Sequence, residues 1–147
     1  MKPTVLYASR SGNTKKIAEE IAQELNCKTL QVTEKGLADA AELENSDLVF
    51  VGTGVRYGYA NEHLLSYLRT ASLKQPKVFA LFVTWGGAGR TSKDAVAQLR
   101  DALGSKGRVL EDCFLCFGGW NLLRRGHPNQ ADGKAAREWA RKTLNSA

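Results

Sequence analysis

Ser9-Arg10-Ser11-Gly12-Asn13-Thr14 lies between two segments of different hydrophobic pattern. Before it, Thr4-Val5-Leu6-Tyr7-Ala8 is an apolar, β-prone run, which predicts a buried strand. After it, apolar residues recur at helical spacing as far as Leu25, which predicts a helix over about 13 to 26. The six residues are therefore expected to join the carboxyl end of a strand to the amino end of a helix.

The residue types in this loop suit a bound phosphate. Unpaired backbone N–H groups and the dipole at a helix amino end favour an anion. Ser9, Ser11 and Thr14 can donate hydroxyl hydrogen bonds, Asn13 can donate from its amide, and Gly12 lets the backbone approach a ligand closely. Neither the Walker nor the Rossmann glycine pattern is present. The alternative is a helix start capped by serine or asparagine, with no ligand.

The rest of the chain alternates strand and helix signals without repeats. Further strands are expected at about 28–32, 47–52, 77–84 and 108–117, and further helices at about 36–46, 60–72, 91–103 and 131–144. This alternation predicts an α/β fold with three layers, in which helices cover both faces of a five-stranded parallel sheet. The expected strand order is 2-1-3-4-5.

Size and composition limit the possible classes of protein. A chain of 147 residues with 43% hydrophobic residues suits a single domain over 1–147. No apolar run is long enough for a membrane span, and the first strand begins almost at Met1, so a cytoplasmic protein is expected. The net charge is +6, but the basic residues are scattered, which argues against nucleic acid as a partner.

The three cysteines are expected to be reduced thiols. Cys27, Cys113 and Cys116 are too few and too unevenly spaced for a disulfide framework. Cys113 and Cys116 have the C-x-x-C spacing, but positions three apart on a strand point to opposite faces. Unless the strand is broken there, the two sulfur atoms cannot converge on one metal ion, so no metal site is expected from this pair.

Three loops are expected to meet at the end of the sheet where its strands have their carboxyl ends. They span 9–14, 53–59 and 85–90, and they follow the first, third and fourth predicted strands. Ligands of such folds bind at the carboxyl ends of strands, beside the point where strand order reverses. A phosphoacceptor receiver domain would need carboxylates here, but Ala8-Ser9-Arg10 and Gly52-Thr53-Gly54 occupy those places. That class is therefore disfavoured.

The first loop resembles the phosphate loop of flavodoxins, [ST]-x-[ST]-G-x-[ST]. With the two later loops and Gly126-His127-Pro128-Asn129, the chain as a whole resembles a short-chain flavodoxin-family protein. The resemblance implies FMN as the cofactor, its phosphate in the first loop and its ring between the other two, where Tyr57 and Trp85 supply flat faces. The implied FMN-binding residues are Ser9, Arg10, Ser11, Gly12, Asn13, Thr14, Thr53, Gly54, Val55, Arg56, Tyr57, Gly58, Trp85, Gly86, Gly87, Gly89 and Arg90.

The resemblance implies an electron-transfer protein that passes one or two electrons between redox partners. Flavodoxins are typically acidic, whereas this chain is basic, so partners with acidic docking surfaces are expected. Arg56 and Arg90 flank the expected ring site, where positive charge favours a negatively charged reduced flavin and raises its potential.

Two alternatives remain open. Gly54-Val55-Arg56-Tyr57-Gly58 also resembles a loop of menaquinone-dependent protoporphyrinogen oxidase, which implies an FMN-dependent oxidoreductase acting on a quinone, a tetrapyrrole or another conjugated small molecule. Arg56, Arg90, Arg124 or Arg125 would then meet an anionic group of the substrate. The other alternative is a binding module of the same fold that has lost its cofactor.

Overall fold

The structure is a computed structural model, and it describes residues 1–119 and 126–147. Within these residues there are seven strands and five helices. The strands are β1 (Pro3–Tyr7), β2 (Thr29–Gln31), β3 (Leu48–Arg56), β4 (Tyr59–Ala60), β5 (Lys77–Trp85), β6 (Gly107–Val109) and β7 (Phe114–Phe117). The helices are α1 (Asn13–Leu25), α2 (Ala40–Glu44), α3 (Glu62–Thr70), α4 (Thr91–Leu103) and α5 (Gln130–Ser146). Strands and helices alternate except that β4 follows β3 and β7 follows β6 directly.

The sheet has the expected strand order but more strands than expected. The order is β2-β1-β3-β5-β6, with parallel pairing throughout this path. β7 also pairs with β5 in parallel, and β4 pairs with the end of β3 in antiparallel fashion. The predicted order is thus confirmed, with β6 and β7 together in the fifth place, whereas the predicted number of five strands is wrong.

One of the two additional strands arises because the predicted strand 108–117 is broken into β6 and β7. β6 pairs with residues 77–79 of β5 and β7 pairs with residues 82–85, so the chain leaves the sheet between them. Two exposed carboxylates, Glu111 and Asp112, interrupt the apolar run at this point. Arg100 of α4 donates hydrogen bonds to the carbonyl groups of Leu110 (2.9 Å) and Glu111 (3.1 Å), which stabilises the excursion.

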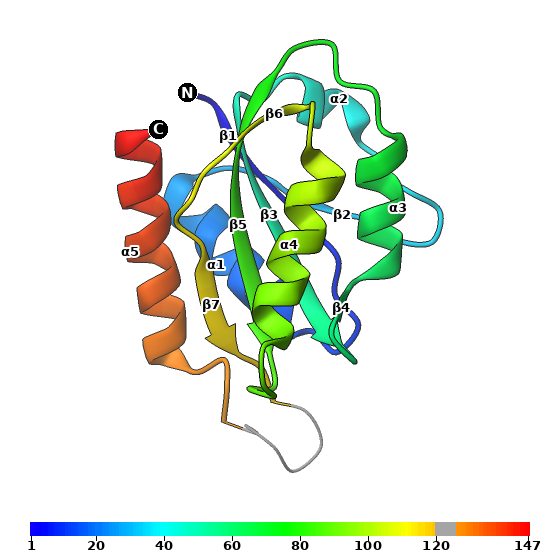
Figure 1. Ribbon diagram of the computed structural model, residues 1–147. Coiled ribbons are helices and arrows are strands. Elements are labelled where there is room, and N and C mark those ends of the chain that lie inside the picture. The colour runs from blue at the N-terminus through cyan, green and yellow to red at the C-terminus, as the bar shows by residue number, and fades with distance from the viewer. Residues whose placement is uncertain (120–125) are drawn as a thin grey trace.

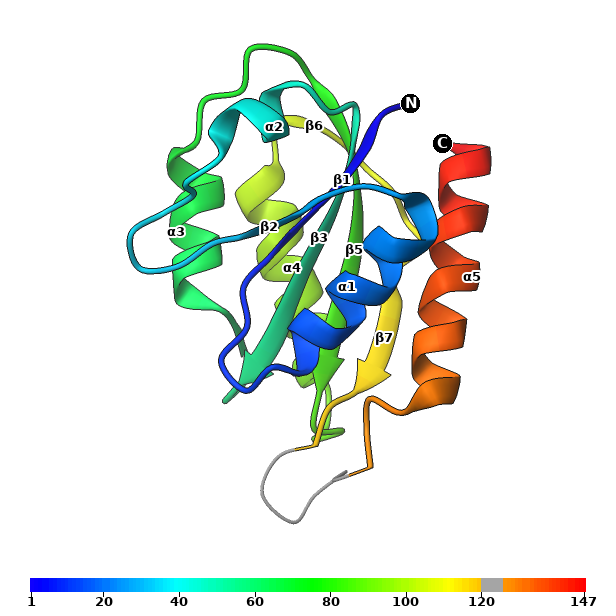
Figure 2. The same cartoon turned by 180° about the vertical axis from the view of Figure 1, so that it is seen from behind.

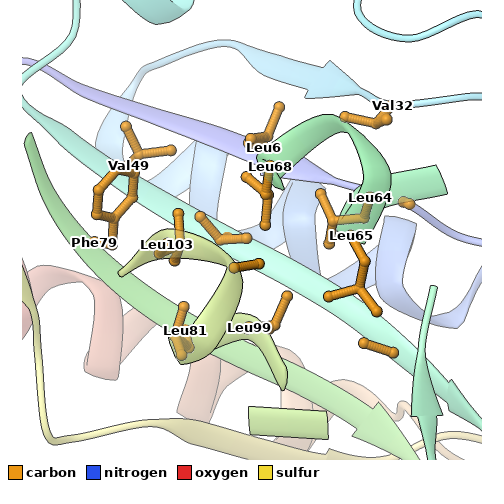
Figure 3. Packing of buried hydrophobic residues seen from close by; sticks show 14 of the residues in the cluster. Leu6, Val32, Val49, Leu64, Leu65, Leu68, Phe79, Leu81, Leu99 and Leu103 are labelled. Atoms are coloured by element: carbon orange, nitrogen blue, oxygen red, sulfur yellow. The ribbon is translucent and has the colours of Figure 1, made fainter. Parts of the chain in front are cut away.

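The helices cover both faces of the sheet, as predicted. Figures 1 and 2 show α1 and α5 on one face and α3 and α4 on the other. Each face has its own buried hydrophobic cluster. Figure 3 shows the α3/α4 side, where Leu64 and Leu68 of α3, Leu99 of α4, and Val49 and Phe79 of the sheet belong to one buried cluster. Burial on both faces explains why β3 and β5 have continuous apolar sequences.

The two cysteines of the C-x-x-C sequence lie on opposite sides of the sheet. Cys113 packs against the cluster on the α3/α4 side, whereas Cys116 belongs to the cluster on the α1/α5 side. Burial raises the pKa of Cys116 to about 12, with the carboxylate of Asp132 adding to the effect. The thiol is therefore protonated at neutral pH and a poor nucleophile. Among the described residues, no group of His, Cys, Asp and Glu side chains could hold a metal ion.

None of the helices in residues 1–119 and 126–147 is long and apolar enough to cross a membrane.

Candidate functional site

The loop from Ser9 to Gly12 joins β1 to α1 and leaves the helix start without a side-chain cap. The N-cap residue is Gly12, whose φ of +92° is in the region that favours glycine, and no side-chain cap hydrogen bond forms there. Ser9 Oγ instead accepts a hydrogen bond from Gly12 N–H at 3.0 Å, within the loop. A Cβ placed on Gly12 would meet no atom within 4 Å, so this side of the loop is open.

The free backbone N–H groups at the start of α1 form the centre of the candidate site. Within the part of the chain that the structure describes, the N–H groups of residues 13–15 have no hydrogen-bond acceptor. The first turn of α1 also carries no acidic side chain. The alternative of a helix start capped by serine or asparagine therefore does not describe this loop. Free N–H groups beside open space are what an anion needs.

Thr14 is buried under this loop and bonds to a residue that sequence reasoning missed. Its side chain is 2% exposed, and its Oγ1 lies 2.8 Å from Oγ1 of Thr84 at the end of β5. One hydroxyl donates to the other, which leaves the hydrogen of the accepting hydroxyl available for a further acceptor. The pair ties the start of α1 to β5. Nothing in the local sequence of β5 identifies Thr84, because the pairing depends on the sheet order.

Asn13 connects the first loop to the segment that follows β7. Its Nδ2 donates to the carbonyl of Gly119 at 2.9 Å, while Gly118 N–H donates to the carbonyl of Trp85 at 2.9 Å. A Cβ on Gly118 would lie 2.9 Å from Asn13 Nδ2, so a larger residue would displace that side chain. Gly119 N–H donates to the carbonyl of His127 at 2.7 Å. These bonds join four segments at the same end of the sheet: the first loop, the end of β5, the residues after β7 and the residues before α5.

The remaining two side chains of the first loop are exposed. Arg10 Nη2 lies 3.0 Å from Oε1 of Glu62, the first residue of α3, in an exposed ion pair. Ser11 is exposed as well. The structure therefore leaves Ser11 accessible to solvent and pairs Arg10 with the start of α3.

The predicted second loop, 53–59, is instead a β-hairpin. β3 continues to Arg56, Tyr57 and Gly58 form the turn, and β4 begins at Tyr59. Both turn residues have positive φ values, +51° for Tyr57 and +81° for Gly58, as a tight hairpin turn requires. A tyrosine in that conformation is uncommon, which is why the sequence did not indicate the turn.

Thr53 and Gly54 lie at the base of the hairpin. Thr53 is fully buried, and its hydroxyl donates to the Gly54 carbonyl (2.7 Å) and accepts from Asn61 N–H (2.8 Å). Its side chain thus supports the turn into α3. Gly54 lies beside the Thr14 and Thr84 hydroxyls, since a Cβ there would be 3.4 Å and 3.8 Å from their Oγ1 atoms.

Gln98 of α4 holds the hairpin at two points. Its Nε2 donates to the Gly58 carbonyl at 3.0 Å, and its Oε1 accepts from Ala60 N–H at 2.8 Å. The side-chain amide thus bonds to backbone groups on both sides of Tyr59. Sequence reasoning missed Gln98, because a glutamine on an amphipathic helix gives no signal until the hairpin is known to lie against it.

Replacing Gln98 with glutamate is expected to make hairpin stability depend on pH. An ionised glutamate accepts from Ala60 N–H but cannot donate to the Gly58 carbonyl, so about 1–2 kcal/mol of stability is lost near pH 8. The protonated carboxyl restores the donor, which raises its pKa in the folded state. The loss relative to wild type is therefore expected to shrink as pH falls from about 8 toward about 4. Urea unfolding and exchange of the Ala60 amide measure both effects.

The matched control is Gln98→Leu, which removes both hydrogen bonds at similar side-chain size. Its loss of stability should not vary with pH relative to wild type. Equal stability of Gln98→Glu and wild type across this pH range would contradict the role of the amide.

The third loop follows β5, and two of its glycines, Gly86 and Gly89, face open space. Trp85 is the last residue of β5, and its ring stacks on that of Phe117 in β7 with 5.9 Å between centroids. Gly87 and Gly89 have φ values of +88° and +55°. A Cβ on Gly86 or Gly89 would meet no atom within 4 Å. Trp85 is thus fixed by β7, and the glycines after it leave room for a ligand.

Two exposed arginines lie at this edge without ion pairs among the described residues. The Arg56 guanidinium lies over the Tyr57 ring, 5.6 Å from its centroid. Arg90 is the N-cap residue of α4, and its side chain makes no cap hydrogen bond. Arg124 and Arg125 lie outside the described residues.

His127 Nδ1 lies 2.6 Å from Oδ2 of Asp132 in the capping box of α5, so its imidazole is oriented by a carboxylate.

The three segments meet at one end of the sheet, as the parallel order predicts. Figures 1 and 2 show the loop before α1, the β3–β4 hairpin and the β5–α4 loop at the same lower end of the molecule. A cleft of about 410 Å³ lies elsewhere, between α1 and the start of α5, and is lined by residues such as Glu20 and Pro128. We place the candidate site at the three segments, because the free N–H groups and open glycines lie there.

Comparisons with known proteins agree with this architecture. The model of the flavodoxin domain family matches residues 4–125. An uncharacterized protein from Methanocaldococcus jannaschii is 34% identical over 158 residues, which cover 99% of this chain and 100% of that protein. The flavodoxin-like domain-containing protein BilS from Clostridioides difficile is 32% identical over 126 residues, which cover 80% of this chain and 66% of that protein.

Solved structures show the same fold at low sequence identity. A flavodoxin, WrbA-like protein from Agrobacterium tumefaciens has a TM-score of 0.81 at 19% identity, with coverage of 99% of this chain and 97% of that one. A Fusobacterium nucleatum flavodoxin, whose crystal structure contains flavin mononucleotide, has a TM-score of 0.67 at 19% identity, with coverage of 99% of both chains. The chain belongs to the flavodoxin domain family.

Proposed function

We propose that this protein binds FMN without a covalent bond and passes one or two electrons between redox partners. The observation that carries the proposal is the loop before α1, where the N–H groups of residues 13–15 have no acceptor among the described residues and Gly12 opens the loop to space. Membership of the flavodoxin domain family supports the choice of FMN among phosphate-bearing cofactors.

The residues at the three segments fit FMN. The helix-start amides and the hydroxyl of Ser11 would hold the phosphate, with Thr14 and Thr84 beneath them. The hairpin from Gly54 to Gly58 and the loop from Gly86 to Arg90 would hold the ring. In that loop Gly86 and Gly89 are beside open space, which allows close approach of the backbone. When bound, FMN supplies the one- and two-electron redox chemistry, and the protein supplies binding, orientation and electrostatics.

The charge around the ring site indicates whether the protein raises or lowers the reduction potential of FMN. Arg56 and Arg90 are exposed and carry no ion pair within the described residues. Positive charge near the ring stabilises a negatively charged reduced flavin and so raises its potential. We therefore propose a potential above that of strongly acidic flavodoxins. A net charge of +6 also favours redox partners with acidic docking surfaces.

Titration with FMN tests the proposal directly. Purified protein that has been freed of endogenous cofactor is expected to quench FMN fluorescence at one equivalent and to give a visible flavin spectrum. Protein isolated with cofactor should be yellow and should release FMN on denaturation. Colourless protein that fails to bind added FMN at micromolar concentration would contradict the proposal.

A second candidate is an FMN-dependent oxidoreductase for a quinone, a tetrapyrrole or another conjugated small molecule. The exposed Arg56–Tyr57 pair favours it, because a cation beside an exposed ring can receive a planar anionic substrate. Steady turnover of quinones or porphyrinogens without a protein partner would rank this candidate first. Efficient reduction by a redox protein, with no such turnover, would rank the electron carrier first.

A further inference from the structure

Thr84 interrupts an apolar row on one face of β5. Val78, Ala80 and Phe82 belong to the buried cluster on the α1/α5 side of the sheet. Thr84 is the next residue on that face, because side chains alternate along a strand, and it is 4% exposed. A valine would continue the row with almost the same shape, whereas a buried hydroxyl costs free energy unless it is hydrogen-bonded. The cost of the Thr84 hydroxyl must therefore be offset by the group to which it bonds.

Among the residues that the structure describes, that group is the hydroxyl of Thr14. The two Oγ1 atoms are 2.8 Å apart, and Thr14 is 2% exposed. The pair has two hydroxyl hydrogens, of which only one lies between the two oxygens. Neither hydroxyl makes a second hydrogen bond within the described part of the chain. One hydrogen of this buried pair is thus available to a ligand.

The places of the two threonines indicate which hydroxyl donates to the other when an anion is bound. Thr14 is the second residue of α1 and belongs to the turn whose N–H groups, at residues 13–15, have no acceptor among the described residues. An anion at this turn would accept from the Thr14 hydroxyl together with the N–H groups. Thr14 then cannot donate to Thr84 as well. The bond between the two hydroxyls must in that case run from Thr84 to Thr14.

Space beside the pair can admit a ligand atom. Gly54 of β3 is opposite Thr84 in the register, and a Cβ on Gly54 would lie 3.4 Å from Thr14 Oγ1 and 3.8 Å from Thr84 Oγ1. These are ordinary contact distances, so one more atom fits there without displacing either hydroxyl. The first turn of α1 also carries no acidic side chain. Hydrogen-bond donors without a nearby carboxylate suit an anionic ligand.

We propose that Thr84 is a positioning residue for the phosphate of FMN: its hydroxyl donates to Thr14 Oγ1, and the Thr14 hydroxyl donates to a phosphate oxygen. This inference rests on the proposed function. In this arrangement Thr84 does not touch the phosphate and acts through Thr14. Without the Thr84 donor, a threonine hydroxyl near a helix start can bond to a neighbouring backbone carbonyl instead. Hydrogen bonds in a chain also polarise one another, which strengthens the bond to the phosphate.

Thr84→Val removes the hydroxyl and keeps the shape of the side chain. It is expected to raise the FMN dissociation constant about fivefold and the riboflavin dissociation constant less than about twofold, because riboflavin has no phosphate. Fluorescence titration of cofactor-free protein with each flavin measures both constants. Thr84→Ser keeps the hydroxyl and should bind FMN within about twofold of wild type. Unchanged FMN affinity in Thr84→Val, equal weakening of both flavins, or a serine variant as weak as the valine variant would each overturn the inference.

A double-mutant cycle tests whether Thr84 acts through Thr14. Thr14→Val is expected to raise the FMN dissociation constant about tenfold, because it removes the hydroxyl that donates to the phosphate. In that background Thr84→Val should cause less than about a twofold further loss. Losses that multiply independently would overturn the inference, since Thr84 would then act on FMN binding without Thr14.

Thr4→Val is the matched control for loss of a buried hydroxyl. Thr4 of β1 is fully buried, and its hydroxyl donates to the Lys28 carbonyl at 3.2 Å. Thr4 is opposite Val49 in the register, near the start of β3, whereas Gly54 and Thr84 meet near the end of that strand. The FMN dissociation constant of Thr4→Val should stay within about twofold of wild type. A fivefold loss in this variant too would overturn the inference, because any buried hydroxyl would then have the same effect.

The wild-type titrations separate this inference from the proposed function. Wild-type protein that binds neither flavin would contradict the proposed function, and the role of Thr84 would be overturned with it. Wild-type protein that binds FMN more tightly than riboflavin supports the proposed function. If the ratio of the two dissociation constants is then the same in Thr84→Val, only the role of Thr84 is overturned.

Discussion

Replacing Gly12 with alanine is expected to weaken FMN binding by about tenfold to a hundredfold and to weaken riboflavin binding much less. Gly12 has a φ of +92°, where an L-residue costs roughly 1–2 kcal/mol. The added Cβ meets no atom within 4 Å, so the effect comes from the backbone and not from a clash. Relaxation of the loop turns the first N–H groups of α1 away from the phosphate position, and each lost hydrogen bond to a charged group costs about 1.5–3 kcal/mol.

Riboflavin provides the internal comparison because it has the ring but no phosphate. If the loop before α1 holds the phosphate, the ratio of the riboflavin and FMN dissociation constants should fall in Gly12→Ala toward one. Fluorescence titration of both ligands measures this ratio. Equal weakening of both ligands would show that the loop contacts the ring or acts through general stability.

Gly36→Ala is the control for backbone strain. Gly36 has a φ of +85°, and a Cβ there also meets nothing within 4 Å. It lies between β2 and α2, in a segment that contributes no predicted site residue. Both variants should lose a similar amount of unfolding free energy, roughly 1–2 kcal/mol. Only Gly12→Ala should lose FMN affinity, and a similar loss in Gly36→Ala would contradict the assignment of the phosphate site.

Much of this site could be predicted from the sequence, because its determinants are local. The apolar run of β1, the periodicity of α1 and the glycine between them are contiguous, and they predict a strand, a loop and a helix start. The strand order could be predicted because parallel strands joined by helices follow a few topologies. Cys113 and Cys116 lie on opposite sides of the sheet, but Cys113 is in the break before β7, so the period of a continuous strand does not account for this placement.

The parts that could not be predicted depend on contacts between distant segments. Thr14 bonds to Thr84 and Gln98 bonds to Gly58, and neither pair has a signature in either local sequence. The hairpin was expected to be a loop because Tyr57, an unusual residue at positive φ, occupies its turn. The break in the predicted strand 108–117 is stabilised by Arg100, on another element, which donates to the carbonyl groups of Leu110 and Glu111.

Replacing Gly52 with alanine is expected to cause a large loss of stability, about 3 kcal/mol. Gly52 of β3 is buried and lies opposite Phe82 of β5 in the register. A Cβ on Gly52 would lie 2.0 Å from Cζ of the Phe82 ring, which is itself fully buried. Overpacking of this kind typically costs 1–3 kcal/mol, and a position between two central strands is at the upper end. Urea unfolding followed by circular dichroism measures the loss.

A double-mutant cycle shows whether the ring of Phe82 causes this loss. Phe82→Leu alone should destabilise the protein by leaving a cavity, but Gly52→Ala with Phe82→Leu should be more stable than the sum of the single changes predicts. Gly54→Ala is the control on the same face of β3, since its Cβ would make ordinary contacts with Thr14 and Thr84 at 3.4 Å and 3.8 Å. Because Gly54→Ala alters the wall of the proposed site without overpacking the core, it should affect FMN affinity more than stability. Additive energies in the cycle would mean that the cost of Gly52→Ala arises in the backbone of β3 and not in its contact with Phe82.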